Sequence, residues 1–330
     1  MNEVHPDVGR GMALCAGPVA LASALVILML SCFMMAPPEA RAAERLMVLT
    51  GTTLIEDVVK AVGGARVETR TVIPGAACPG HYDMRASDIA AFARADIILL
   101  HDWQRGQSHI KAMLATDAGA AGKVRVPEAP GNWMLPQVQA RGTAAVTALL
   151  AEADTAFAED YARRGGERVA RIGAVGEEVR EAVKRAGVVG QPVIADAMQR
   201  PLLEWMGLRV VADYGRFEEM GAEALGRAMT AAREAGAVLA VDNLQSTGGA
   251  GAALAADLGA RHVVLTNFPG GFPDAPDWES SLRRNVEIVL GALRDSVSVA
   301  EAHGDGGTMS PVPVASTTLR TACPAPVGLP

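Results

Sequence analysis

The feature that most constrains the fold is an alternation of short apolar runs and helix-like stretches, which occurs in two separate blocks of the chain. In the front block the apolar runs are residues 45–50, 67–73, 96–100 and 124–126. In the back block they are residues 193–195, 208–212, 237–241 and 262–265. Because this alternation is typical of parallel strands covered by helices, the sequence predicts an α/β fold with two lobes, each built on a mainly parallel sheet.

The stretch between the blocks has almost no strand character. Residues 136–186 are rich in Ala, Glu and Arg, and apolar residues recur there at spacings of three and four. We expect one helix to about Arg163, a break at Gly165–Gly166 and a second helix to Ala186. Such a segment could be an ordinary helical hairpin or, more specifically, a long rigid connector that joins the two lobes.

The N-terminus reads as an export signal. An apolar run from Met12 to Met35 is followed by the small-residue site Ala40–Ala42, which predicts cleavage and a periplasmic location. A retained membrane anchor is the alternative, because the run could just span a bilayer. Lipid attachment at Cys32 is not expected, since the residues before it match the required motif poorly.

These features divide the chain into five expected regions. They are a signal peptide at 1–43, an N-terminal α/β lobe at 44–135, a connector helix region at 136–189, a C-terminal α/β lobe at 190–293 and a disordered tail at 294–330, which is rich in Gly, Pro, Ser and Thr. The net charge of −7 and the absence of a basic run argue against a nucleic-acid partner.

Polar side chains follow the predicted strands at their carboxyl ends, where ligands bind in open α/β sheets. The main candidates are Cys78, His81, Asp83, His101, Asp196 and Asp242. Histidine with carboxylate suits zinc, manganese or iron, and a thiolate shifts the preference toward zinc or softer metals. Asp196 could instead cap a helix.

Two cysteines remain after signal cleavage, Cys78 and Cys323. Exported proteins normally pair their cysteines, so a bridge between these two is one hypothesis. The proximity of Cys78 to His81 in the sequence suggests a metal ligand instead, and a small buried residue is the third alternative.

Sequence signatures of enzymes are weak in this chain. The first strand is followed by no phosphate-binding glycine loop, and the chain contains neither Gly-x-Ser-x-Gly nor His-Glu-x-x-His. We therefore expect a binding protein rather than an enzyme.

The chain resembles the periplasmic metal-binding receptors of zinc and manganese ABC importers, over about residues 45–293. The likeness depends on motifs that occur in the family's order. These stretches are Pro79–Asp83, Ser87–Asp88, Ala95–Ile98, Asn132–Pro136, Ala153–Tyr161, Gly207–Leu208 and Ala255–Ala260. The resemblance implies two lobes, a rigid connector with small closure motions, and a monomer that passes a divalent metal to an inner-membrane permease.

The resemblance also implies four ligand positions, and this chain departs from the pattern at two of them. His81 matches the first ligand and Asp196 the third, whereas Asn132 stands in place of the second histidine. The fourth position, near Thr266–Asn267, has no carboxylate. Either Cys78 and Asp242 replace the missing ligands, or the site has changed to another cargo.

The predicted function is thus a periplasmic receptor that captures zinc, manganese or iron between two lobes and delivers it to an ABC importer. His81, Asp196, Cys78, Asp242 and Asn132 are the predicted metal ligands, with zinc or manganese as the expected cargo. Two alternatives stay open: a periplasmic metal-dependent hydrolase, with Asp83 or Asp242 as its base, and a degenerate receptor that acts as a metal chaperone.

Overall fold

The computed structural model describes residues 45–116, 119–215, 220–246 and 250–303. The predicted signal peptide, Cys32, Cys323 and residues 304–330 lie outside these ranges. Of the helices in the described part of the chain, none has the length and apolar character needed to cross a membrane.

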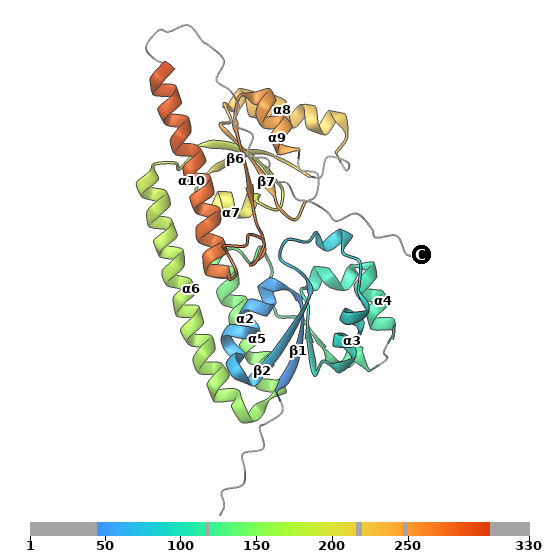
Figure 1. Cartoon of the computed structure of the whole chain (residues 1–330). Helices are drawn as coiled ribbons and strands as arrows, with labels where there is room; N and C mark the ends of the chain where they lie inside the picture. The colour runs from blue at the N-terminus through green and yellow to red at the C-terminus, as the bar shows by residue number, and fades with distance from the viewer. Residues whose placement is uncertain (1–44, 117–118, 216–219, 247–249, 304–330) are drawn as a thin grey trace, which may run out of the picture. The chain divides into compact units, whose positions relative to one another are not determined.

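The front lobe contains a four-stranded parallel sheet in the order β2-β1-β3-β4 (Figure 1). Its strands are β1 (Leu46–Thr52), β2 (Val67–Ile73), β3 (Ile97–Leu99) and β4 (Val124–Arg125). The helices between them are α2 (Thr53–Gly63), α3 (Ala86–Arg94) and α4 (Ser108–Thr116). The central strands β1 and β3 are mostly apolar and buried because helices cover both faces of the sheet, whereas the edge strands β2 and β4 carry polar, exposed residues.

The back lobe repeats this arrangement with the order β6-β5-β7-β8, again all parallel. Its strands are β5 (Pro192–Asp196), β6 (Arg209–Tyr214), β7 (Leu239–Asn243) and β8 (Arg261–Leu265), and its helices are α7 (Arg200–Trp205), α8 (Ala222–Ala235) and α9 (Gly251–Leu258). The predicted fold class, two parallel-sheet lobes flanked by helices, is confirmed.

The connector consists of α5 (Pro136–Ala153) and α6 (Ala158–Ala186), but its break is not where the glycines predicted it. Helix α6 continues through Gly165 and Gly166, and the chain turns at Asp154 instead. The carboxylate of Asp154 accepts hydrogen bonds from Arg66 Nε (2.7 Å) and Tyr161 Oη (2.9 Å), which stabilise the turn.

Gly165 has a packing role within α6. A Cβ atom at this position would lie 2.3 Å from Thr147 Oγ1 of α5, so glycine permits the close approach of the two helices. The conformational cost of glycine in a helix is offset here by tight helix–helix packing.

Helix α3 begins at Ala86, with Arg85 as its N-cap residue. The side chain of Asp88 caps the helix by accepting a hydrogen bond from Arg85 N at 2.9 Å.

The last helix, α10 (Trp278–His303), lies beside α6 and extends beyond the predicted end at 293 (Figure 1). Trp278 is fully buried, and its Nε1 donates to Trp133 O at 2.9 Å. Arg168 of α6, also buried, pairs with Asp57 of α2 and with Glu279 of α10. These contacts fix the connector helices to both lobes.

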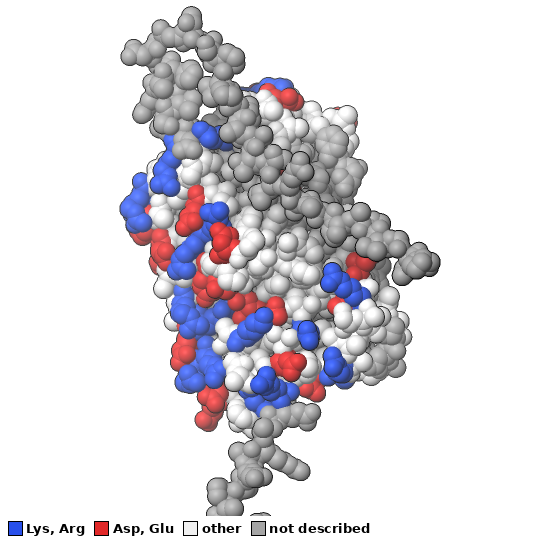
Figure 2. All heavy atoms as spheres, viewed as in Figure 1, with Lys and Arg blue, Asp and Glu red and all other residues white. Residues whose placement is uncertain are grey.

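Figure 2 shows side chains of both charge signs along the α6 and α10 side of the molecule. Several are paired within one helix, such as Arg163 with Asp160 and Glu167, and Arg283 of α10 pairs with Glu178 of α6 at 2.7 Å. Interspersed, paired charges are typical of a solvated helix face.

Candidate functional site

The loop after β2 carries the first two predicted ligands and brings them together. Pro79–His81 form a single 3-10 turn, with His81 N donating to Cys78 O at 3.2 Å. This turn places Cys78 Sγ 3.6 Å from His81 Nδ1. Cys78 is buried, whereas His81 is exposed to solvent, so the His81 side of the pair is accessible from outside.

Asp83, in the same loop, is exposed and is not part of a group with this pair. The neighbouring Tyr82 donates its hydroxyl to Asp88 Oδ2 at 2.9 Å, and its ring lies edge-on to His109. Tyr82 and Asp88 thereby attach the loop to the first turn of α3.

Asp196 ends β5 at the equivalent edge of the back-lobe sheet and is buried. Its Oδ1 accepts a hydrogen bond from Met198 N at 2.8 Å, and its carbonyl accepts from Gln199 N at 2.8 Å. The side chain therefore caps the turn before α7 rather than the helix itself, whose N-cap residue is Gln199.

Asp242 lies at the end of β7 and is the centre of a buried hydrogen-bond network. Its Oδ1 accepts from Tyr214 Oη (2.9 Å) and from Gly251 N (3.0 Å), and its Oδ2 lies 2.8 Å from His262 Nε2. Burial, and secondarily the carboxylate of Asp242, raises the pKa of Tyr214, so its hydroxyl stays a donor. These partners come from β6, α9 and β8 of the same lobe.

The strand register explains this arrangement. Ala195 pairs with Val241 and Asp196 pairs with Tyr214, so both aspartates and the tyrosine lie on the same face of the back-lobe sheet. The apolar residues on this face, including Ile194 and Ala240, form a core with Leu254 of α9. Asp242 thus helps to hold α9 against the sheet, because it accepts the hydrogen bond from Gly251 N.

Asn132 forms contacts between the lobes. Its Oδ1 accepts from Met134 N (2.8 Å), while its Nδ2 donates to Met198 O (3.1 Å) and Asn267 Oδ1 (3.3 Å). Asn132, which was expected in place of a second histidine, therefore contacts Asn267. The sequence analysis had noted only that no carboxylate stands near Thr266–Asn267, and nothing in the sequence indicated this pairing.

The structure thus brings Cys78 to His81, and Asn132 to Asn267, as two separate pairs. Across the described ranges, no three His, Cys, Asp or Glu side chains form a group that could hold a metal ion. Asp196 and Asp242 consequently form no such group with the Cys78–His81 pair.

His101, at the end of β3, has a structural environment that the sequence did not predict. It is buried, its Nε2 lies 2.9 Å from Thr52 Oγ1, and its ring stacks on Trp103 and meets Trp133 edge-on. Burial lowers the pKa of His101 to about 3, so the imidazole is neutral at neutral pH.

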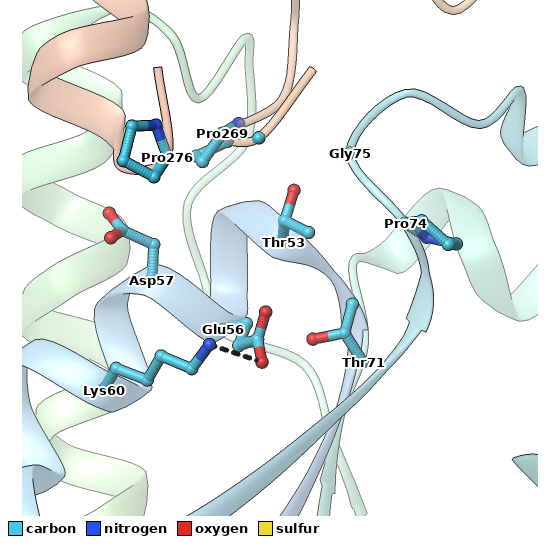
Figure 3. A pocket seen from close by; sticks show the side chains of 10 residues that line it. Thr53, Glu56, Asp57, Lys60, Thr71, Pro74, Gly75, Pro269 and Pro276 are labelled. Carbon is cyan, nitrogen blue, oxygen red and sulfur yellow. Dashed lines mark ion pairs between the residues drawn. The ribbon is translucent and has the colours of Figure 1, made fainter. Parts of the chain in front are cut away.

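A pocket of about 400 Å³ lies between α2, the end of β2 and the loop Pro269–Pro276 (Figure 3). Its carboxylates already have partners: Glu56 pairs with Lys60 at 2.8 Å, and Asp57 pairs with Arg168. Burial raises the pKa of Asp57 despite this pairing. Because none of the predicted ligands lines the pocket, we place the candidate site at the strand ends instead.

Comparison with known families decides the identity of the fold. A family model described as zinc-uptake complex component A, periplasmic (ZnuA), matches residues 48–292. The chain belongs to this family. The expectation of a periplasmic metal-capturing receptor for an ABC importer is thereby confirmed, and the expectation of a binding protein agrees with a family of solute-binding proteins.

Solved structures agree on the fold. A crystal structure of ZnuA shares 17% identity at a TM-score of 0.63, covering 76% of this chain and 99% of that one. A cadmium-bound periplasmic metal-binding protein from Candidatus Liberibacter asiaticus shares 15% identity (TM-score 0.63), and its manganese-bound form 14% (TM-score 0.64); each covers 74% of this chain and 98% of its own. No curated protein sequence matches.

Proposed function

We propose that this chain captures a divalent transition metal ion at the Cys78–His81 pair and delivers it to the permease of an ABC importer. The observation that carries the proposal is the 3.6 Å separation between Cys78 Sγ and His81 Nδ1. Tetrahedral zinc, with bonds of about 2.3 Å to sulfur and about 2.0–2.1 Å to nitrogen, places two such ligands about 3.5 Å apart. The two side chains thus have the spacing of neighbouring ligands on one ion.

The proposed roles follow from what each side chain already binds. His81 is the primary ligand through a ring nitrogen, and Cys78 is the thiolate ligand. Asp196 caps the turn before α7 and forms no group with this pair, so we propose no ligand role for it. To ligate, Asp242 would have to give up buried hydrogen bonds to Tyr214, Gly251 and His262. The amide oxygen of Asn132 already accepts from Met134 N, so we propose supporting roles for both residues.

The remaining parts of the proposal concern location and assembly. We propose that the N-terminal segment is cleaved on export, that the mature chain works in the periplasm as a monomer, and that it binds its cargo without chemical turnover. The solved relatives whose descriptions name zinc, cadmium or manganese support a divalent cargo.

Elemental analysis tests this function directly. The protein would be purified from the periplasm without chelator, together with His81→Ala and, as a matched control, His262→Ala. We expect stoichiometric zinc or another transition metal in the wild type and the control, and its loss in His81→Ala. Wild-type protein without metal, which also binds none on addition, would contradict the proposal.

A further inference from the structure

The pocket beside α2 has two walls of different chemistry (Figure 3). The polar wall carries Glu56, Asp57 and Lys60 of α2, and the other wall carries Pro74, Pro269 and Pro276. A volume of about 400 Å³ is in the usual range for small-molecule sites. Because one proline follows β2 and the other two follow β8, a molecule bound here would contact both lobes.

Each carboxylate of the polar wall has an oxygen left for a ligand. Asp57 accepts hydrogen bonds from Arg168 Nη2 and from a backbone N–H, both at Oδ2. Glu56 contacts Lys60 Nζ (2.8 Å) and Thr69 Oγ1 (3.2 Å), both at Oε1. In the part of the chain that the structure describes, Asp57 Oδ1 and Glu56 Oε2 have no hydrogen-bond partner. These two oxygens suit a ligand that carries N–H or O–H donors.

The charges around the pocket favour a cation. The carboxylates of Glu56, Asp57 and Glu279 are paired with Lys60 and Arg168, so three negative charges and two positive ones leave one negative charge. Burial raises the pKa of Asp57, Arg168 lowers it, and Glu279 raises it again. A cation beside Asp57 would favour its ionised form and offset the cost of burying it.

An organic cation fits this pocket better than a metal ion does. Among the described residues, no three His, Cys, Asp or Glu side chains come together around an ion, and the prolines supply apolar carbon. A primary ammonium group has three N–H donors for carboxylate oxygens, and its alkyl chain can pack on proline rings. We propose that the pocket is a second ligand site, separate from the Cys78–His81 pair, which binds a small primary amine as its ammonium ion through Glu56 and Asp57.

An NMR titration of the purified protein with n-butylammonium chloride tests the proposal, with 1-butanol as the uncharged control. We expect the amine, but not the alcohol, to shift the amide signals of Gly75 and Gly270 saturably. Glu56→Gln should weaken amine binding at least about tenfold. Lys60→Met removes a competing cation and should strengthen it about two- to fivefold. Asp83→Asn, which changes an exposed carboxylate in another loop, should bind the amine as the wild type does.

Several results would overturn this assignment. They are the absence of a saturable shift with the amine, equal shifts with the alcohol, and unchanged amine affinity in folded Glu56→Gln and Lys60→Met. Displacement of the amine by Mg²⁺ in the wild type, but not in Glu56→Gln, would assign the pocket to a metal ion instead. Since the proposal does not depend on metal capture, His81→Ala should bind the amine normally, and a loss there would place the amine at the front-lobe loop.

Discussion

Two groups of polar side chains occupy equivalent strand ends in the two lobes, yet their surroundings differ. In the front-lobe loop, His81 is exposed, and within the described residues the hydrogen bond found for its side chain is the one to Cys78. In the back lobe, Asp242 is buried and its carboxylate binds Tyr214, His262 and Gly251 N. Both side chains lie at the carboxyl ends of parallel strands, but His81 is accessible to a ligand whereas Asp242 is already occupied by hydrogen bonds.

The difference teaches how to separate a structural polar residue from a candidate ligand. A buried carboxylate whose oxygens have partners on three neighbouring elements stabilises the fold, because losing it leaves those donors unsatisfied. An exposed imidazole beside a thiol contributes little to folding and can turn toward an ion. Substitutions in the back-lobe network should consequently reduce stability, whereas substitutions in the front-lobe loop should reduce metal binding and leave stability nearly unchanged.

The largest expected effect is that of Asp242→Ala. The change leaves Tyr214 Oη and Gly251 N buried without an acceptor, so the free energy of unfolding should fall by about 2–4 kcal/mol. Chemical denaturation measures this loss. A matched Asp83→Ala variant, which removes an exposed carboxylate of the front loop, should change stability by no more than about 0.5 kcal/mol. Equal losses of stability in the two variants would contradict the distinction between the buried carboxylate and the exposed one.

The next effect is the pH dependence contributed by His101, which sharpens the contrast with exposed His81. The folded pKa of His101 is about 3, below its unfolded value of about 6.5. The unfolded chain therefore takes up the proton first, and stability is lost as the pH falls below 6.5, by about 1.4 kcal/mol per unit down to pH 3.

Substitution separates this contribution from those of the carboxylates. His101→Asn should be less stable at neutral pH, but between pH 6.5 and pH 5 it should lose about 2 kcal/mol less than the wild type. Unfolding curves at several pH values measure the difference. Parallel pH profiles for the two proteins would show that His101 does not stay neutral in the fold.

A smaller effect is expected for His262→Ala. The side chain is partly exposed, so removing it takes away one hydrogen bond to Asp242 and about 1 kcal/mol of stability, as thermal or chemical unfolding would show. The Tyr214 and Gly251 bonds would remain. A loss as large as that of Asp242→Ala would mean that His262, rather than the carboxylate, holds the network together.

The sequence predicted the fold closely because alternation of strands and helices is a local pattern. Apolar runs located all eight strands of the described structure. The connector break was wrong because the glycines of α6 serve packing against α5, which depends on tertiary contacts. Asp154, which forms the real break, depends on Arg66, a residue 88 positions away.

The candidate site was harder to predict for the same reason. Cys78 and His81 are three positions apart in the chain, so their proximity could be predicted from the sequence. The burial of Asp242 and the contact between Asn132 and Asn267, 135 residues apart, depend on how the sheets and lobes pack. Residue type and strand position carry no information about which partners a side chain finds.

The smallest effect on stability is expected for His81→Ala. Its exposed imidazole packs little, so the free energy of unfolding without metal should change by less than about 0.5 kcal/mol. Denaturation in the presence of a chelator measures this. A loss above about 1 kcal/mol would place His81 among the structural histidines and weaken the contrast between the two regions.

The most direct test of the central claim is a calorimetric titration of zinc into the metal-free wild type, His81→Ala and His262→Ala. If the ion binds at the front-lobe loop, His81→Ala should lose at least about tenfold in affinity, which corresponds to about 1.4 kcal/mol, while His262→Ala binds as the wild type does. Unchanged zinc affinity in His81→Ala would contradict the account.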